Sequence, residues 1–394
     1  MKKQIIFLFF LLLSEVGISQ TWNPIGPDTA NISRIDFGVA VQRHVLCADN
    51  GFYVYNYGNN TCEFFSNGGL PVAGAGYFNN EKILVAMGDG SWSDGVYTFD
   101  LSTHDFEPMD WFVWPNFLHY HETTSTWWVG SDWGGLWKSA DGVIWEAVET
   151  FSTFPCISLA SQGQHLVVQL ISDLTNGYWS NDNGESWYPS ELSPGFSDMA
   201  FHYDGQLLGI FPYYSNSSGL WKSDDFGNSW QIEIYQDNMS AVCFDVFSEI
   251  IVGFDGEGVG IYHPGNGIDF INADLPNLNI NKIQVNQTMS APALFVSTDQ
   301  GAYFSYDYYV GMDVDENNEA KIQLSPNPAN GILNIKSDIN LKSIKLINPS
   351  GQLVYKRNIS GMAFQINTTE FSSGIYTLQL ETEKGVSVRK VVVR

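Results

Sequence analysis

A short pattern that recurs along most of this 394-residue chain constrains its fold more than any other feature. The pattern is an apolar stretch, a loop, and then Gly followed by an apolar or aromatic residue and an aromatic residue. Successive copies begin 44, 40, 42, 42, 41 and 41 residues apart. Repeats of this length indicate an array of similar structural units. The copies are Gly51-Phe52-Tyr53, Gly95-Val96-Tyr97, Gly135-Leu136-Trp137, Gly177-Tyr178-Trp179, Gly219-Leu220-Trp221, Gly260-Ile261-Tyr262 and Gly301-Ala302-Tyr303.

Each unit is predicted to form four short strands, because turn residues divide it and no helical period is sustained. In the fifth unit the predicted strands are Asp198 to Tyr203, Gln206 to Phe211, Gly219 to Ser223 and Ser229 to Ile234. Four strands in about 40 to 45 residues are typical of one blade of a β-propeller. The sequence therefore predicts an all-β protein in which residues 20–310 form a seven-bladed β-propeller.

The two ends of the repeat array indicate how the ring closes. The last unit runs into Tyr303 to Tyr309 without a fourth strand that begins with Trp. The segment Thr21 to Ile25 resembles Ser229 to Glu233, which is a predicted fourth strand. We therefore expect the N-terminal segment to supply the outer strand of the last blade, which removes a free sheet edge.

Charge and composition exclude several classes of protein. The chain has 18 Lys and Arg against 43 Asp and Glu, a net charge of −25, and residues 21–310 hold 6 basic and 34 acidic residues. Such a chain lacks the basic clusters that neutralise phosphates, so nucleic acid is not an expected partner. Charged residues make up 15% and aromatic residues 15%, which argues against a disordered chain or a coiled coil.

The first 19 residues are predicted to be a signal peptide. Lys2 and Lys3 precede the apolar run Ile5 to Leu13, and Gly17 and Ser19 are the small residues expected before a cleavage site. This run is too short to span a bilayer, and no later apolar run is long enough. We therefore expect no transmembrane segment in the mature chain.

The four cysteines, Cys47, Cys62, Cys156 and Cys243, lack the spacing of a zinc site. Cys47 and Cys62 fall on the second and fourth strands of one unit, so a third strand separates them. No disulfide is expected between them, and all four cysteines are expected to be buried and unpaired.

Three units carry a sharper motif in the turn between their third and fourth strands. Two of these turns read S-x-D-x-G-x-S-W, and the third is one residue shorter. An Asp in such a turn can accept backbone N–H groups, Gly supplies a positive φ, and Trp packs beneath the hairpin. The residues expected to do this are Ser139, Asp141, Trp145, Ser180, Asp182, Gly184, Trp187, Ser223, Asp225, Gly227 and Trp230.

These turns resemble the Asp-box, or BNR repeat, of sialidase-like propellers, over about residues 21–310. The resemblance implies that the boxes are structural and lie on the face away from the ligand. Sialidase activity is disfavoured, because that family clamps a substrate carboxylate with three arginines and this region contains only Arg34 and Arg43. Propellers of the photosystem II assembly-factor type, which carry basic patches, are disfavoured for the same reason.

The composition changes near residue 311, since all 13 Trp residues precede it. Residues 311–321 are predicted to be an acidic linker, and residues 322–394 a small C-terminal β-sandwich. In that sandwich the predicted strands include Ile332 to Ile335, Ser343 to Asn348, Leu353 to Arg357 and Ala363 to Ile366.

The C-terminal stretch resembles the type A C-terminal sorting domain (T9SS) of the type IX secretion system of Bacteroidetes. This resemblance implies contact with the secretion machinery, passage across the outer membrane, removal of the domain, and a cell-surface or extracellular location. The motif residues that carry it are Pro326, Asn327, Pro328, Gly331, Gly351, Gly374, Tyr376 and Lys390.

The loops between second and third strands share a propeller face with the connections between blades. On this face the sequence gathers aromatic rings beside acidic side chains, which suit the C–H faces and hydroxyl groups of a sugar. Tyr213 and Tyr214 are expected on the same side, while His119 and His121 alternate along a first strand and are expected in the channel or core. The predicted ligand-binding residues are Trp92, Trp111, Trp114, Trp133, Asp89, Asp94 and Asp132.

The expected function is a non-catalytic binding or adhesion module, with a glycan as the candidate ligand. One alternative is a glycoside hydrolase or lyase that uses paired acidic residues on the same face. Another is a protein-interaction scaffold at the outer membrane. No catalytic residue is assigned, since no nucleophile elbow or phosphate loop is present. The acidic loops at Asp89-Gly90 and Asp255 to Gly258 lack the twelve-residue calcium pattern, so no metal or cofactor is expected.

Overall fold

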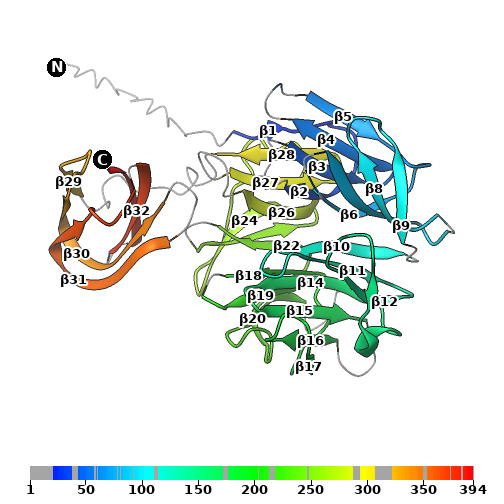
Figure 1. Ribbon diagram of the computed structural model, residues 1–394. Helices are drawn as coiled ribbons and strands as arrows, with labels where there is room; N and C mark the ends of the chain where they lie inside the picture. The colour runs from blue at the N-terminus through cyan, green and yellow to red at the C-terminus, as the bar shows by residue number, and fades with distance from the viewer. Residues whose placement is uncertain are drawn as a thin grey trace, which may run out of the picture.

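The structure is a computed structural model, in which nearly all regular structure is β-strand (Figure 1). Within the described residues the single helical element is a 3₁₀ turn, η1 (Glu149–Phe151), and no helix is long and apolar enough to cross a membrane. The predicted all-β class is confirmed, while the predicted signal peptide (1–19) and linker (311–321) lie outside the described residues. The structure describes residues 21–37, 43–56, 59, 61–77, 79, 81–91, 93–110, 114–171, 176–202, 204–212, 218–245, 248–286, 293–306, 322–348, 353–372, 374–382 and 385–393.

The described residues between 23 and 305 form seven four-stranded antiparallel sheets. In the first six, the strands pair in the order of the sequence. In chain order these six sheets are β2 (Ile32–Phe37), β3 (Arg43–Ala48), β4 (Gly51–Asn56) and β5 (Thr61–Phe65); β6 (Val72–Tyr77), β7 (Lys82–Met87), β8 (Gly95–Asp100) and β9 (Phe106–Asp110); β10 (Pro115–His121), β11 (Thr126–Ser131), β12 (Gly135–Ser139) and β13 (Glu146–Ala147); β14 (Cys156–Gln162), β15 (His165–Leu170), β16 (Gly177–Ser180) and β17 (Tyr188–Pro189); β18 (Asp198–Phe201), β19 (Leu207–Phe211), β20 (Gly219–Ser223) and β21 (Gln231–Tyr235); β22 (Met239–Phe244), β23 (Ile250–Phe254), β24 (Gly258–His263) and β25 (Gly267–Phe270). The seventh sheet consists of β26 (Ile280–Asn286), β27 (Ala293–Thr298), β28 (Gly301–Ser305) and the N-terminal β1 (Asn23–Pro24).

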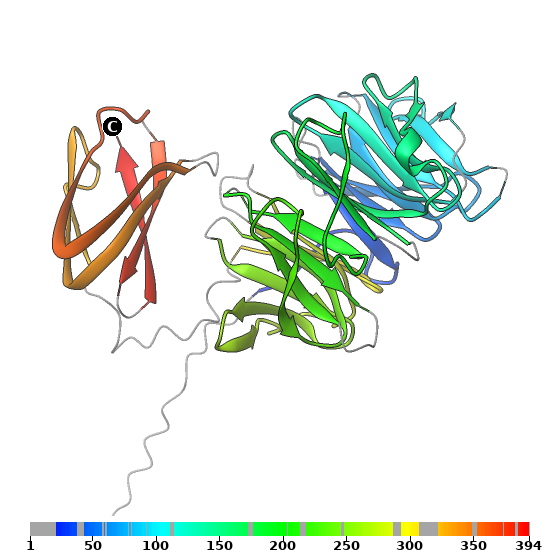
Figure 2. The ribbon, with the colours of Figure 1, turned by 90° about the horizontal axis from the view of Figure 1, so that it is seen from below.

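The seven sheets stand around a closed circle. The first strand of each sheet contacts the first strand of the next, from β2 through β6, β10, β14, β18 and β22 to β26, and β26 contacts β2 again. Figures 1 and 2 show these sheets fanned around a common axis. The arrangement is propeller-like, with the first strands innermost.

The second strand of each sheet is almost wholly apolar because neighbouring sheets cover both of its faces. In β7 every residue from Ile83 to Met87 is buried, and in β27 all six residues are buried. Burial on two faces removes the alternation of apolar and polar residues that a half-exposed strand shows. The core of the ring therefore lies between the sheets.

In six of the seven sheets the repeated glycine begins the third strand, and at several of these positions the backbone is crowded. A Cβ at Gly51, Gly135 or Gly219 would lie 2.0–2.2 Å from a carbonyl oxygen of the segment that follows the third strand. Gly51 and Gly219 also have φ values of 145° and 137°, and Gly135 has 73°. Only a residue without a side chain fits this geometry, which explains why the sequence repeats Gly here.

The ring closes through the N-terminal segment. β1 pairs with β28, and the Ile25 N–H donates to the Ala302 carbonyl at 2.9 Å. Trp22 (7% exposed) packs into the core between the sixth and seventh sheets, and Ile25 (0%) packs between the seventh and the first. The prediction that the N-terminal segment completes the last sheet is confirmed.

The C-terminal residues form one five-stranded sheet in the order β29 (Gln323–Ser325), β30 (Ile332–Ile347), β32 (Gly374–Thr382) and β33 (Gly385–Val393), with β31 (Leu353–Asn367) also paired to β30. The sequence predicted two separate strands within β30 and two within β31, and this prediction is wrong because each is continuous. Register shifts between Lys336 and Ser343 bend β30 without ending it. An irregularity of this kind redirects a strand while its pairing continues.

The cysteines are unpaired, as expected, but they are not all buried. Cys47, Cys156 and Cys243 are buried, whereas Cys62 is exposed. Cys62 lies on β5, the outer strand of its sheet, which no neighbouring sheet covers fully. β4 separates β3 from β5, so the expectation that Cys47 and Cys62 do not bridge is confirmed.

We expect Trp22→Ala to lower the free energy of unfolding of the ring by about 3–5 kcal/mol, the usual cost of removing a buried Trp side chain. The measurement is chemical denaturation followed by Trp fluorescence. This signal reports on the ring alone, because no Trp lies beyond residue 311. Trp133→Ala, at a position that is 73% exposed, is the matched control and should cost less than about 0.5 kcal/mol. Equal effects of the two substitutions would contradict the role of Trp22 in closing the ring.

Candidate functional site

Two of the tryptophans predicted to bind a ligand are exposed to solvent. Trp133, in the turn between β11 and β12, is 73% exposed, and Trp114, just before β10, is 43% exposed. The Trp114 ring lies over the loop between β7 and β8, because a Cβ on Gly90 would be 2.8 Å from it. We call Trp114 and Trp133 the tryptophan shelf. The further candidates Trp92, Trp111, Tyr213 and Tyr214 lie outside the described residues.

Asp94 holds the β7–β8 loop together. Its Oδ1 accepts the backbone N–H groups of Asp89 (2.9 Å) and Ser91 (3.1 Å), and its Oδ2 accepts those of Gly90 (2.8 Å) and Trp114 (2.9 Å). Asp94 is only 2% exposed. Its carboxylate therefore fixes the loop beneath Trp114, in place of the ligand contact expected from the sequence.

Asp132 and Asp89 remain at the surface near the shelf. The Asn116 side-chain amide donates to Asp132 Oδ1 at 2.6 Å, and the Asp132 N–H donates to the Trp114 carbonyl at 3.0 Å. Asp89 is exposed and Asp132 is half-buried. These bonds join the connection before β10, which carries Trp114 and Asn116, to the β11–β12 turn, which carries Asp132 and Trp133.

The first strands enclose a central cavity of about 740 Å³. Gly88, Pro115 and Asn116 line it where it meets the shelf. The basic side chains of Arg34 and Lys282 also line this cavity.

Both of these basic side chains form ion pairs with carboxylates that also accept a backbone N–H from the next sheet. Arg34 Nε lies 2.9 Å from Asp36 Oδ1, and Asp36 Oδ2 accepts the Ala75 N–H of the next sheet at 2.9 Å. Lys282 forms an ion pair with Asp198, whose Oδ2 accepts the Val242 N–H of the next sheet at 3.0 Å. These charges are engaged in holding the innermost strands in place.

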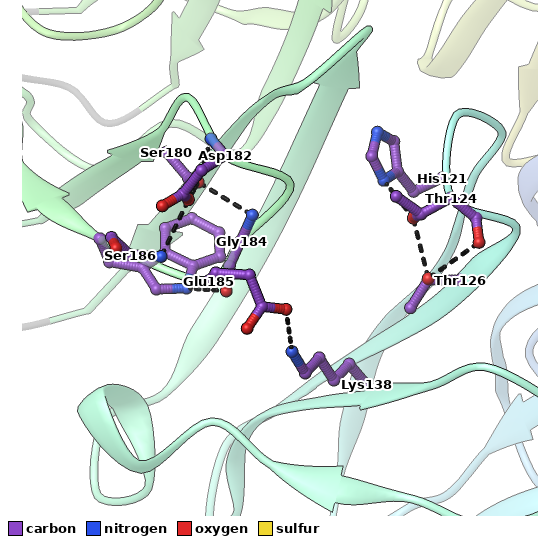
Figure 3. A network of polar contacts seen from close by, with 10 residues as sticks. His121, Thr124, Thr126, Lys138, Ser180, Asp182, Gly184, Glu185 and Ser186 are labelled. Atoms are coloured by element: carbon purple, nitrogen blue, oxygen red, sulfur yellow. Dashed lines mark hydrogen bonds and ion pairs between the residues drawn. The ribbon is translucent and has the colours of Figure 1, made fainter.

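The two histidines of β10 occupy different environments. His119 lines the central cavity with Nε2 2.7 Å from Ser161 Oγ, and burial lowers the pKa of His119 to about 3, so it is neutral at pH 7. His121 Nδ1 lies 2.9 Å from Thr124 Oγ1 (Figure 3). Its other ring nitrogen, Nε2, lies 2.7 Å from the Gly163 carbonyl oxygen. Across the described residues, no cluster of three or more His, Cys, Asp or Glu side chains could hold a metal ion.

The turn from Ser180 to Trp187 is built around Asp182 (Figure 3). Asp182 Oδ1 accepts the Ser186 N–H at 2.9 Å and the Ser180 hydroxyl at 2.8 Å. The Gly184 N–H donates to Ser180 Oγ at 2.9 Å, with a φ of 83° at Gly184. The backbone N–H of Ser186 is the main reason why the pKa of Asp182 is lowered.

The same contacts recur in the other two turns. Asp225 Oδ1 accepts from the Ser229 N–H and the Ser223 hydroxyl, both at 2.8 Å. Asp141 Oδ1 accepts the N–H groups of Val143 (2.9 Å) and Ile144 (2.8 Å). Beneath these turns Trp145 and Trp230 are buried, Trp187 is half-buried, and Gly227 has a φ of 88°.

The Ser180 to Trp187 turn also packs on the preceding sheet. A Cβ at Gly184 would lie 2.6 Å from the buried Trp128 ring. Glu185 forms an ion pair with Lys138 at 2.8 Å (Figure 3). The turn therefore joins two sheets, which gives it a structural role.

The motif residues near the C-terminus hold the last sheet together. The Asn327 side chain donates to the Lys390 carbonyl at 2.9 Å and accepts the Val392 N–H at 2.8 Å. Tyr376 is 3% exposed, and its hydroxyl donates to the Ser372 carbonyl at 2.8 Å. Of the other motif residues, Gly351 lies outside the described residues, Gly331 has a φ of 97°, Gly374 begins β32, and Pro326 and Pro328 flank Asn327.

Asn116 and the charged layer of Arg34, Asp198 and Lys282 were not predicted from the sequence. These three charged residues occupy the same register on the first strands of the first, fifth and seventh sheets. An alignment of the first strands on the repeated glycine would have placed them in one layer. No comparable signal identifies Asn116, because its contacts are made between loops.

The C-terminal residues 323–394 match the family described as the secretion system C-terminal sorting domain. The protein is therefore exported by type IX secretion to the cell surface or the extracellular space, and its C-terminal domain interacts with the secretion machinery. Among curated proteins, none matches the chain in sequence.

Three solved structures share the fold at low sequence identity. PorZ, an essential bacterial surface component of the type IX secretion system of Porphyromonas gingivalis, is 14% identical with a TM-score of 0.53, over 94% of this chain and 60% of PorZ. The extracellular domain of the one-component system BT4673 from B. thetaiotaomicron is 12% identical (TM-score 0.55; 95% of this chain, 52% of that one). YCF48 bound to the D1 peptide is 13% identical (TM-score 0.55; 73% and 96%). The likeness concerns the fold, and this chain spans less than two thirds of the first two proteins.

We expect Asp182→Asn to lower the thermal unfolding midpoint at pH 7, because the turn loses a charged acceptor. The pKa of Asp182 is lower in the folded state than its unfolded value of about 3.9. The stabilisation is therefore present above about pH 4 and is lost as the pH falls through the lowered pKa. The midpoints of wild type and variant should converge toward pH 2 in a thermal melt series. A gap that stays constant from pH 7 to pH 2 would argue against this role for Asp182.

Proposed function

We propose that the propeller-like domain is a non-catalytic glycan-binding module displayed outside the cell. The observation that carries this proposal is the tryptophan shelf, where Trp133 presents 73% of its surface to solvent and follows the half-buried Asp132 in the same turn. An exposed indole offers an apolar face for sugar C–H groups, and the carboxylate offers acceptors for sugar hydroxyl groups. The exposed Asp89 belongs to the same proposed surface, and Trp92 and Trp111 stay sequence-based candidates for it.

The domain is proposed to be a seven-bladed propeller of the Asp-box class, with one four-stranded sheet for each blade. The three similar turns around Asp141, Asp182 and Asp225 support this assignment. In the same proposal, the bent strands β30 and β31 fold the sorting domain over itself as a β-sandwich.

Sialidase chemistry is not part of the proposal. Residues 21–310 contain two arginines, and one of them, Arg34, is bound to Asp36 inside the ring. A three-arginine clamp for a sugar carboxylate cannot be assembled from these residues. The fixed state of Asp94, whose two carboxylate oxygens accept four backbone N–H groups, also argues against its use as a catalytic acid or base.

Trp133→Ala and Trp114→Ala should each weaken glycan binding by about tenfold or more, the usual effect of removing an aromatic anchor. The measurement is a glycan array followed by titration of the best polysaccharide. Tyr235→Ala is the matched control, since Tyr235 is 66% exposed on the outer strand β21, away from the shelf. Unchanged binding by both Trp variants would show that the tryptophan shelf is not the glycan-binding site.

The same polysaccharides should be assayed for release of reducing ends. Binding without release is the expected result. Release of reducing ends would favour a glycoside hydrolase, whereas an absence of glycan binding together with capture of a surface protein would favour a scaffold.

A further inference from the structure

Two lysines lie directly opposite each other on the C-terminal sheet (Figure 1). Lys345 of β30 is the register partner of Lys356 of β31. Residues opposite each other on antiparallel strands lie on the same face, with Cβ atoms about 4.5–5.5 Å apart. Ile344 and Leu346, which flank Lys345, are buried in the core of the domain, so Lys345 and Lys356 lie on the opposite face of the sheet. We call Lys345 and Lys356 the lysine pair.

The same face carries a third lysine. Lys345 is also opposite Gln379 of β32, and Thr377, two residues before Gln379, is opposite Lys390 of β33. Because side chains alternate along a strand, Lys390 lies on the face of the lysine pair. Lys356 and Lys390 are exposed, and Lys345 is half-buried. Three positive charges therefore gather on one face, across four paired strands.

The basic side chains of the propeller-like domain are engaged differently. In that domain five of the six basic residues form ion pairs, namely Arg34, Lys82, Lys138, Lys222 and Lys282. None of the ion pairs within the described part of the chain includes Lys345, Lys356 or Lys390. The acidic residue nearest in register is Glu381, whose Oε2 accepts the Ser343 hydroxyl at 2.7 Å. The lysine face therefore carries positive charge without a bound counter-charge.

The lysine pair makes the sheet less stable than it could be. Like charges directly opposite each other destabilise an antiparallel pair, and one acidic or neutral residue at either position would remove this repulsion. An acidic surface that docks on the lysine face would supply the missing negative charge. Complementary charges of this kind also raise the rate of encounter with the correct partner. The repulsive pair therefore indicates a binding role for this face.

We propose that the lysine pair and Lys390 form the face by which the sorting domain docks on an acidic surface of a protein of the secretion machinery. That the domain interacts with the machinery follows from its family. The proposal adds which face makes the contact and which charge the partner carries. It is independent of the proposed glycan binding, because it concerns a different domain.

Lys356→Glu tests the proposal, because its effects on folding and on docking have opposite directions. Within the sheet it replaces a repulsive pair by an attractive one, so hydrogen exchange of β30 and β31 in the purified full chain should not become faster. Toward an acidic partner it replaces attraction by repulsion. In cells with an intact type IX system, immunoblots of the surface and medium against the periplasm should show the exported fraction of the full chain falling by about tenfold. Normal export of Lys356→Glu would overturn the proposal.

Two variants serve as controls. Lys356→Arg keeps the charge and should be exported like the wild type. Lys336→Glu makes the same charge change at an exposed lysine of β30 that is opposite the neutral Ala363, so it should change export less than about twofold. Equal losses in Lys336→Glu and Lys356→Glu would show an effect of net charge alone, and the assigned face would then be wrong.

Two other negatively charged surfaces are separated by further measurements. Burial raises the pKa of Glu249, on the turn between β22 and β23, while the charges of His263 and Lys345 act to lower it. If Glu249→Gln reduced export as strongly as Lys356→Glu, the lysine face would bind the propeller-like domain, and the proposal would be wrong. Phosphatidylglycerol vesicles test a lipid surface. Vesicle binding by the purified full chain that disappears in Lys356→Glu would assign the face to lipid phosphates instead; no such binding is the expected result.

Discussion

The pairing of β1 with β28 is the contact on which the rest of the ring depends. Each sheet has its apolar faces covered by two neighbours, so the core is continuous only if the circle is closed. Trp22 and Ile25 extend this closure into the cores on both sides of the seventh sheet. The short strand therefore acts through its flanking side chains as much as through its backbone bonds. Loss of this contact would expose the edge of β28 and weaken two cores together.

The small number of basic side chains affects both the interior of the ring and the face that carries the tryptophan shelf. Of the 6 basic residues in residues 21–310, Arg34 and Lys282 line the central cavity, where they pair with carboxylates that also bind the next sheet. The tryptophan shelf is consequently flanked by acidic and amide side chains, namely Asp89, Asp132 and Asn116. This distribution suits a ligand rich in hydroxyl groups better than an anionic one.

Much of the fold could be predicted because the repeat is imposed by backbone geometry. The glycine at the start of the third strand has no room for a Cβ, and the second strand is buried on both faces, so both features appear in the sequence. The continuity of β30 could not be predicted, because a strand that bends shows the same break in pattern as two strands. The exposure of Cys62 could not be predicted for a similar reason, because the sequence does not show how far neighbouring sheets cover the outer strand.

The candidate site was harder to predict than the fold. The sequence placed Asp94 and Asp132 in loops of one face, but it could not show that four backbone N–H groups converge on Asp94 while Asp132 stays at the surface. Such differences arise from loop conformation, which has no period in the sequence.

The closure also has a consequence for the order of folding. The segment at residues 23–24 is among the first described parts of the chain to be synthesised, yet its partner strand at residues 301–305 is made only after six sheets have preceded it. Contacts between such distant segments carry a high loop-closure entropy and form late. During export the chain should therefore pass through an open, incomplete arc, and it should gain its full resistance to proteolysis only when the last sheet is complete.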